Sequence, residues 1–189
     1  MPSKKIVIFA SGSGSSVENI ILKFKKTPNT EVVKIYCDNP KAYVLDRAKK
    51  HNITYLIFNS SDLKNNVVFD DLNLIRPDLI VLAGFLKKIP ENIIKSFKKR
   101  VINIHPSLLP KYGGKGMYGL NVHKKVIVNN DSETGFTIHH VNKEYDEGDI
   151  IFQKKIEVDT SLADELAKKV LKEEHKHYPL IIEKILNES

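Results

Sequence analysis

The sequence predicts an α/β protein whose mostly parallel sheet is flanked by helices and carries an antiparallel addition towards the C-terminus. Short β-rich runs that alternate with helical patterns predict the parallel part, and one of them, 79–86, contains no charged residue. Two further β-rich runs near the C-terminus are separated only by a short turn-forming segment, which predicts the antiparallel part.

In the first half of the chain, strands and helices alternate. The run Lys5–Ala10 ends in the glycine and serine segment 11–16, after which apolar residues recur with helical spacing at positions 17, 20, 21 and 24. Further strands are predicted at 31–37, 53–58, 78–83 and 101–104. Further helices are predicted at 39–50, capped by Asn39 and Pro40, at 90–99, and over a segment whose end is 69–75. This order predicts a Rossmann-like sheet with right-handed crossovers, in which ligands bind beyond the carboxyl ends of the strands.

The second half is less regular. Residues 105–120 are rich in proline and glycine and predict a long functional loop. A helix at 121–128 precedes the two strands, 133–141 and 149–158. The final helix is predicted to open at Ser161–Asp164, to bury Leu162, Leu166 and Val170, and to be kinked or interrupted by Pro179. We expect one domain over 1–189, with halves at 1–104 and 105–189.

The composition is that of a soluble globular protein. The 189 residues are 41% hydrophobic and 28% charged, with a mean hydropathy of −0.27. A single cysteine, Cys37, excludes an internal disulfide framework and a cysteine-cluster metal site. No apolar run approaches the ~18 residues of a membrane span, and Ile6–Ala10 is too short for a signal peptide. We therefore expect a cytoplasmic protein without a membrane segment.

The net charge of +7 raises the question of a nucleic-acid partner. Of the 30 basic residues only Arg47, Arg76 and Arg100 are arginines, and lysine lacks the planar fork with which arginine reads bases. The lysines lie mostly on the polar faces of predicted helices, as expected for solvated surfaces. A small anionic substrate is favoured, and a basic nucleic-acid-binding domain is the alternative from another class.

The first loop, Gly12–Ser16, follows a strand and precedes a helix, where backbone N–H groups can bind a phosphate. A dinucleotide-binding loop needs a small residue where this chain has Val17, so a single phosphate is favoured over a nicotinamide cofactor. A merely flexible turn is the structural alternative.

Asn103 and His105 end a predicted strand two residues apart, so both side chains point to the same side. An amide and an imidazole can together stabilise a developing oxyanion, and Asp146 could orient the imidazole. A packed strand-end histidine and a turn aspartate remain the alternatives. The histidines at 139 and 140, and those at 175 and 177, diverge and predict no metal site.

Taken together and in order, these motifs closely resemble the phosphoribosylglycinamide formyltransferases, a family of folate-dependent enzymes. The strings that carry the resemblance are SGSGS at 11–15, LAGFL at 82–86, NIHPSLLPKY at 103–112, ETG at 133–135, DEG at 146–148 and HKHYP at 175–179. The resemblance implies a single formyltransferase domain with a phosphate-binding half at 1–104 and a catalytic loop in the second half. Another folate-dependent formyltransferase, acting on methionyl-tRNA or a nucleotide sugar, is the closest alternative.

The resemblance also implies the reaction and its residues. The formyl group of 10-formyltetrahydrofolate would pass to the amino group of glycinamide ribonucleotide, a step of purine biosynthesis, without a metal. Asn103, protonated His105 and Asp146 are expected to be catalytic. The ribonucleotide is expected to bind at Gly14, Ser15, Ser16 and Glu174, and the folate at Leu86, Lys87, Lys88, Ile89, Asn103 and, as a candidate, Lys64. The protein is expected to be a monomer or homodimer that acts on these small molecules rather than on nucleic acid or a membrane.

Three positions depart from the family pattern. Ser16 stands where asparagine is common, and Lys88 occupies a position that is usually apolar. The segment 113–119 is longer and richer in glycine than the usual loop.

Overall fold

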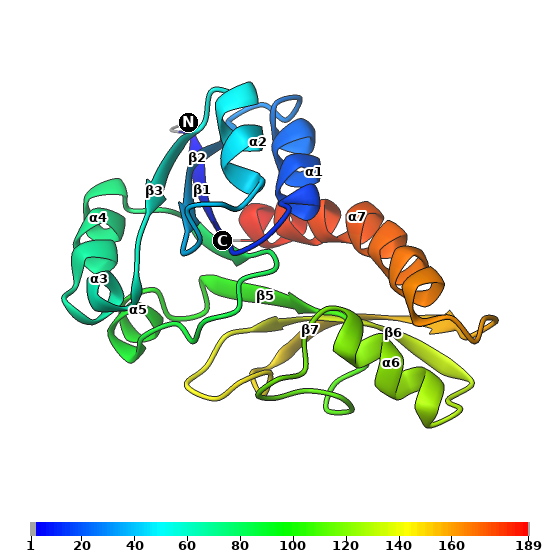
Figure 1. The fold of residues 1–189 in the computed structure, drawn as a ribbon. Helices are drawn as coiled ribbons and strands as arrows, with labels where there is room; N and C mark the ends of the chain where they lie inside the picture. The colour runs from blue at the N-terminus through cyan, green and yellow to red at the C-terminus, as the bar shows by residue number, and fades with distance from the viewer. Residues whose placement is uncertain (1–2, 189) are drawn as a thin grey trace.

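The computed structural model describes residues 3–188 and confirms the α/β fold with a mostly parallel sheet (Figure 1). Its strands are β1 (Lys4–Ala10), β2 (Thr30–Cys37), β3 (Thr54–Ile57), β4 (Leu79–Leu82), β5 (Val101–His105), β6 (Glu133–His140) and β7 (Ile150–Glu157). Its helices are α1 (Ser15–Phe24), α2 (Val44–Lys50), α3 (Ser60–Lys64), α4 (Val67–Ile75), α5 (Glu91–Ser96), α6 (Leu120–Val128) and α7 (Ala163–Asn187).

The strands form one sheet in the order β3-β2-β1-β4-β5-β6-β7. Strands β1 to β5 pair in parallel, whereas β6 pairs antiparallel with both β5 and β7. After β3 the chain returns to the other side of β1, so the direction of strand order reverses between β1 and β4. Ligands in open α/β sheets bind at such a reversal, beyond the carboxyl ends of the strands.

Alternate residues of β1 build two hydrophobic layers. Ile6 and Ile8 pack with the apolar faces of α1, α2 and α7. Val7 and Phe9 point to the opposite face, where α3, α4 and α5 cover the sheet and the Phe9 ring stacks on Tyr36 at a centroid distance of 4.6 Å. The strand is buried on both sides, which explains its continuously apolar sequence.

Two local predictions in the first half were wrong. The second helix begins at Val44 instead of Asn39, because the Asn39 side chain accepts the N–H of Lys41 at 3.0 Å within a turn, and the Val44 N–H bonds to the Gly12 carbonyl at 3.2 Å. Helix α3 was not predicted, although the Asn59 side chain and Asp62 form a reciprocal capping box at its start.

The final helix also differs from expectation at two points. Helix α7 continues through Pro179, which lies buried within it, so Pro179 does not interrupt the helix, and a kink there stays a prediction. Its first turn is supported by Thr160, whose hydroxyl accepts the N–H of Leu162 at 3.1 Å and donates to Glu165 at 2.6 Å, and not by a capping box at Ser161. Leu162 is 57% exposed and does not join the buried face formed by Leu166 and Val170.

The predicted boundary between the halves, at residue 104, falls inside β5. Strand β5 pairs with β4 from the first half and with β6 from the second. The division into halves stays a prediction.

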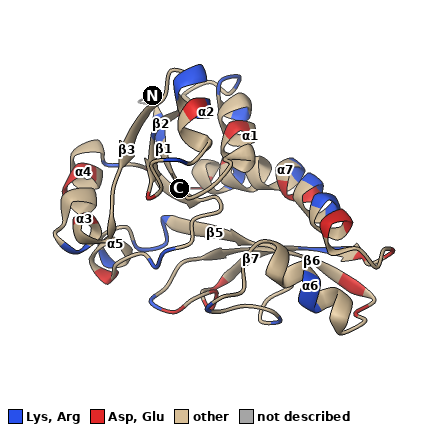
Figure 2. Ribbon diagram, in the orientation of Figure 1, with Lys and Arg blue, Asp and Glu red and all other residues tan. Residues whose placement is uncertain are grey.

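Charged residues of both signs lie interspersed along α7 and recur on α1 and α2 (Figure 2). Several pair on one helix or between neighbours, as Lys23 does with Glu183 at 2.8 Å. Within residues 3–188, no helix has the length and apolar character needed to cross a membrane.

Candidate active site

A cleft of about 780 Å³ opens at the carboxyl ends of β1, β4 and β5, where the strand order reverses. It is lined by residues from the first loop, the segments after β4 and β5, the α6 region, the loop after β6 and helix α7. The predicted site residues that line it are Gly14, Ser15, Ser16, Leu86, Lys87, Lys88, Ile89, Asn103, His105, Asp146 and Glu174. Lys64 does not line this cleft.

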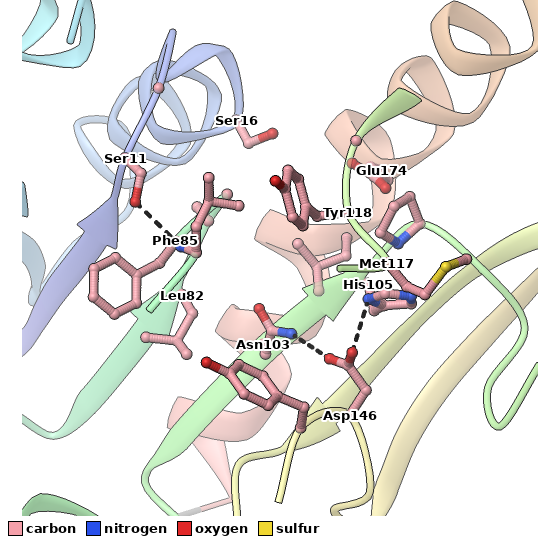
Figure 3. A pocket seen from close by; sticks show the side chains of 18 of the residues that line it. Ser11, Ser16, Leu82, Phe85, Asn103, His105, Met117, Tyr118, Asp146 and Glu174 are labelled. Carbon is pink, nitrogen blue, oxygen red and sulfur yellow. Dashed lines mark hydrogen bonds and ion pairs between the residues drawn. The ribbon is translucent and has the colours of Figure 1, made fainter. Parts of the chain in front are cut away.

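The three residues expected to be catalytic converge in the cleft (Figure 3). The Asn103 amide nitrogen donates to Asp146 Oδ1 at 3.5 Å, and His105 Nδ1 lies 3.4 Å from Asp146 Oδ2. Asp146 adopts a left-handed backbone conformation, with φ 59°, and its Oδ2 also accepts the Gly114 N–H at 2.9 Å. The Asp146 carboxylate is thus held by the Gly114 N–H while it contacts both Asn103 and His105.

His105 is 4% exposed, and its protonation state follows from that burial. Burial lowers the pKa of His105 below its ordinary value of 6.5, and this effect outweighs the opposing influence of Asp146 and of the Tyr112 carbonyl. The neutral imidazole therefore predominates at pH 7 in the free cleft, and the protonated His105 expected during the reaction stays a prediction. Burial also acts to raise the pKa of Asp146, but the neighbouring His139 and His105 outweigh it, so the pKa is lowered and the carboxylate is ionised.

His139 belongs to the same cluster, which the sequence did not reveal. It faces Asn103 across the β5–β6 pair, and the Asn103 Nδ2 lies 3.2 Å from its Nε2. Its Nδ1 lies 2.9 Å from the His140 carbonyl, an acceptor, so Nδ1 carries the hydrogen and Nε2 accepts from Asn103. His139 thereby orients the Asn103 amide, and only the antiparallel register, which the sequence does not specify, brings the two together.

His123 is a second missed residue. It lies on α6, lines the cleft, and is 3% exposed. Burial, with a smaller effect of His105, lowers the pKa of His123 to about 4, so the ring is neutral at pH 7. Its Nδ1 has no hydrogen-bond partner within the described part of the chain. The sequence signal was hidden because His123 sits among the apolar positions Val122 and Val126.

The first loop reaches the cleft through the start of α1. Gly14 has φ 73°, in the left-handed region, and a Cβ added there would lie 2.5 Å from Val44 Cγ2. The Arg47 Nε donates to the Ser13 carbonyl at 2.9 Å, and Arg47 also pairs with Glu18 in the first turn of α1. The glycine at this position and the contacts with α2 fix the shape of the loop. In this shape the N-terminus of the ten-residue helix α1 is accessible to an anion.

Glu174 lies in the same cleft on α7 and is 8% exposed. Burial raises the pKa of Glu174 to about 7, so a substantial fraction of the carboxyl is neutral near pH 7. A buried, partly neutral carboxyl can donate or accept a hydrogen bond to a polar ligand. Its burial among α7 residues is not visible in the sequence pattern alone.

The residues expected to hold a folate, 86–89, line the cleft in the segment after β4. Lys87 pairs with Asp38 at 3.4 Å, and Lys88 pairs with Glu144 at 3.5 Å and lies over the Tyr145 ring at 5.6 Å. Lys64 lies instead in an adjoining cavity of about 510 Å³, which shares Leu86, Lys87, Lys88 and Tyr145 with the main cleft. Three lysines thus surround this cavity, a setting that favours an anionic group.

Among residues 3–188 no three His, Cys, Asp or Glu side chains are grouped so that they could hold a metal ion.

Comparison with known proteins identifies the family. Residues 4–182 match the formyl transferase family. The chain is 38% identical to the chloroplastic phosphoribosylglycinamide formyltransferase of Arabidopsis thaliana over 98% of its own length, and it spans 66% of that protein. It is 34% identical to the phosphoribosylglycinamide formyltransferase of Bacillus subtilis, covering 97% of this chain and 95% of the relative.

The fold agrees with these relatives. The crystal structure of phosphoribosylglycinamide formyltransferase from Anaplasma phagocytophilum matches with a TM-score of 0.89 at 28% identity, over 98% of this chain and 88% of that one. Sequence and fold agree along nearly the whole chain, and so this chain belongs to the formyl transferase family and, within it, to the phosphoribosylglycinamide formyltransferases.

Proposed function

We propose that the protein transfers the formyl group of 10-formyltetrahydrofolate to the amino group of glycinamide ribonucleotide. The products are formylglycinamide ribonucleotide and tetrahydrofolate, a step of purine biosynthesis. The observation that carries the proposal is one cleft in which Asn103, His105 and Asp146 meet while the Gly14–Ser16 loop opens into it. The Arabidopsis and Bacillus relatives are phosphoribosylglycinamide formyltransferases, which supports glycinamide ribonucleotide over methionyl-tRNA or a nucleotide sugar as acceptor.

The reaction begins when the lone pair of the glycinamide amine attacks the formyl carbon. A carbon–nitrogen bond forms, and the carbonyl electrons move to the formyl oxygen, which becomes an oxyanion. The Asn103 amide, which contacts Asp146 and His139 in the free cleft, and the His105 imidazolium formed in the reaction are the groups that donate to this oxygen, and donors in a buried site stabilise such charge strongly. The developing negative charge favours the imidazolium, so His105 gains its proton in the reaction and not in the free cleft.

Collapse of the tetrahedral intermediate then breaks the bond between the formyl carbon and the folate nitrogen. The leaving nitrogen needs a proton, and the attacking amine must lose one. The ionised Asp146 accepts the amine proton directly or through water and passes it to His105 Nδ1, which lies 3.4 Å from its carboxylate. His105 then gives this proton to the leaving folate nitrogen. No proton is gained or lost overall.

Each substrate is assigned to its own set of residues lining the cleft. Gly14, Ser15 and Ser16 hold the ribonucleotide phosphate with backbone N–H groups at the start of α1, and Glu174 contacts the glycinamide end. Leu86, Lys87, Lys88 and Ile89 hold the folate, with Lys64 and the adjoining cavity facing its anionic tail.

The test is a direct transfer assay with purified protein, glycinamide ribonucleotide and 10-formyltetrahydrofolate. Asn103→Ala, His105→Ala and Asp146→Asn should each lower kcat by about 10²–10³, because each removes a group that acts on the transition state. Initiator methionyl-tRNA offered in the same assay should receive no formyl group. Full activity in all three variants would contradict the assignment of these residues.

We also propose that the protein acts in the cytoplasm as a monomer or homodimer on these small molecules, and not on nucleic acid or a membrane. The single cysteine, Cys37, is buried and suits a reducing compartment. Light scattering of the purified chain distinguishes the two oligomeric states.

A further inference from the structure

A short backbone turn contacts both members of the His105–Asp146 pair. The Tyr112 carbonyl accepts a hydrogen bond from His105 Nε2 at 2.8 Å. Two residues later, the Gly114 N–H donates to Asp146 Oδ2 at 2.9 Å. The segment 112–114 therefore holds the imidazole from one side and the carboxylate from the other.

The contact with Tyr112 decides which nitrogen of His105 is protonated. A carbonyl oxygen can only accept, so Nε2 must carry the hydrogen. The other nitrogen, Nδ1, lies 3.4 Å from the ionised Asp146, and it has no hydrogen in the neutral ring. Nδ1 is thus the nitrogen that can gain and lose a proton, next to a carboxylate that stabilises its charged form.

The carbonyl is in this place because Tyr112 adopts an unusual backbone conformation. Its φ is 57°, in the left-handed region, which costs a bulky residue free energy and persists only where surrounding contacts hold it. Strain of this kind beside a functional group is a reason to ask what holds the residue in place.

The phenol of Tyr112 provides the anchor. Its hydroxyl donates to Asp131 Oδ2 at 2.7 Å and accepts from the Asn129 side-chain amide at 2.6 Å, at the C-terminal end of α6. Lys111 pairs with the other oxygen, Asp131 Oδ1, at 2.7 Å, and lies 5.3 Å from the centre of the Tyr112 ring. Hydrogen bonds from Lys111 and Tyr112 lower the pKa of Asp131, so the anchor is a charged acceptor.

We propose that Tyr112 is a positioning residue: its hydroxyl, anchored to Asp131, fixes the backbone carbonyl that holds His105 in the Nε2–H tautomer and leaves Nδ1 to exchange a proton beside Asp146. This inference deepens the proposed function, because it rests on His105 acting in formyl transfer. Tyr112 itself touches no reacting atom.

The first test reads the tautomer directly, without any substrate. Nitrogen-15 NMR of the histidine side chains, with the His105 signals assigned by comparison with His105→Asn, should show a protonated Nε2 and an unprotonated Nδ1 in the neutral native protein. Tyr112→Phe keeps the carbonyl and removes the anchor, and we expect its His105 signals to move towards a mixture of tautomers. Tyr55→Phe, which alters an exposed tyrosine on β3, is the matched control and should leave them unchanged.

The second test is kinetic. Tyr112→Phe should lower kcat about tenfold with little change in KM for either substrate, because one hydrogen bond to a charged group is lost and ligand contacts are not. Asp131→Asn keeps the Tyr112 hydroxyl and replaces its carboxylate partner with an amide of the same size, so it should lower kcat in the same way but by less. This variant keeps the test valid if Tyr112→Phe folds poorly. Lys111→Met, which removes the exposed ion pair to the same carboxylate and the exposed contact with the Tyr112 ring but leaves the hydroxyl anchor, should change kcat less than about twofold.

The outcomes separate the two ideas. Unchanged His105 signals in folded Tyr112→Phe and Asp131→Asn overturn the positioning role, even if kcat falls. Shifted signals with lowered kcat support it. A wild-type protein that shows the Nε2–H tautomer but transfers no formyl group contradicts the proposed function and leaves the tautomer result standing on its own.

Discussion

Gly14 is a residue whose backbone conformation a side chain would oppose. Its φ of 73° lies in the left-handed region, and the space that a Cβ would need is filled by Val44, including the Val44 Cα at 2.9 Å. Because Val44 begins α2, a larger residue at 14 must push the first loop away from that helix. The shape of the first loop, which we propose to bind phosphate, therefore depends on the absence of a side chain at Gly14.

Gly14→Ala should lower the free energy of unfolding by about 2 kcal/mol, since strain in the left-handed region adds to the clash with Val44. It should also raise KM for glycinamide ribonucleotide more than KM for the folate. Urea unfolding and steady-state kinetics measure both effects. Gly12→Ala is the matched control, because a Cβ there meets nothing within 4 Å, and a loss of stability equal to that of Gly14→Ala would contradict the explanation.

Glu174 illustrates how burial sets a charge state. Its carboxyl has a pKa of about 7 in the folded protein and the ordinary value of 4.5 when unfolded. A raised pKa means that the folded state binds the proton more tightly, so the stabilisation is fully present below pH 4.5 and is lost as the pH rises through 7.

Glu174→Gln removes this titration. The variant should gain stability relative to the wild type as the pH rises from 4.5 to 7, reaching a difference of about 3 kcal/mol at pH 8. Urea unfolding of both proteins at pH 5 and pH 8, without substrate, gives the comparison. Glu173→Gln is the control, because a hydrogen bond from Lys176 lowers the pKa of Glu173, and it should not gain stability over this range. Parallel pH curves for wild type and Glu174→Gln would refute the account.

At the scale of elements, α7 links the C-terminal part of the chain to the parallel part of the sheet. The Tyr178 hydroxyl donates to the Leu82 carbonyl at 2.9 Å, which ties the helix to the end of β4. Glu174 lies one turn earlier on the same face, so this bond also fixes the position of Glu174 in the cleft. The position of Glu174, which we propose to contact the ribonucleotide, thus depends on how the whole helix packs against the sheet.

The start of α7 offers a test of its stabilisation. Thr160→Ala removes the hydroxyl that accepts the Leu162 N–H and should cost about 1 kcal/mol, as expected for the loss of a capping side chain. Ser161→Ala should change stability by less than about 0.5 kcal/mol, because exposed substitutions away from such contacts have small effects. Thermal unfolding of both variants decides between Thr160 and the capping box predicted at Ser161, which would reverse the two results.

The elements that the sequence predicted well are those with a continuous apolar run. The parallel strands were predicted from such runs between helical patterns, because strands buried on both faces are apolar throughout. The Gly12–Ser16 loop was predicted from its glycines. Helix α2 was placed too early because Asn39 favours both caps and turns, and only the docking of Val44 against the first loop decides.

The candidate site was predictable where it lies in one short string. Asn103 and His105 share a strand, and the spacing alone puts them on one side. His139 joins them through the register of β5 with β6, and His123 through the packing of α6, and both depend on long-range contacts that local sequence does not encode.

At the scale of the whole molecule, buried histidines govern the response to acid. Burial lowers the pKa of His105, His123, His140 and His175, with His123 reaching about 4. A lowered histidine pKa means that the unfolded chain binds protons more readily, so stability is present above pH 6.5 and is lost as the pH falls towards 4. Glu174 acts in the opposite direction, but it is a single group.

We therefore expect the free energy of unfolding to fall as the pH is lowered from 6.5 to 4, and His123→Asn to reduce the steepness of that fall. Urea unfolding across this range measures the slope. Tyr55 lies on an exposed edge and carries no charge in this range, so Tyr55→Phe should keep the wild-type slope. A His123→Asn slope equal to that of the wild type would show that this ring does not contribute.

The residues that line the cleft extend along the chain from position 11, near one end, to position 174, near the other. No shorter stretch contains all of them, so the cleft of a chain still emerging from the ribosome is incomplete. It cannot bind a substrate until α7 has packed against the sheet. Ligands that bind only the assembled state protect it by mass action, by about 2.7 kcal/mol at a hundred times their dissociation constant. The supply of substrate then bears on how long each copy survives proteolysis, since proteases attack the opened chain and not the occupied one.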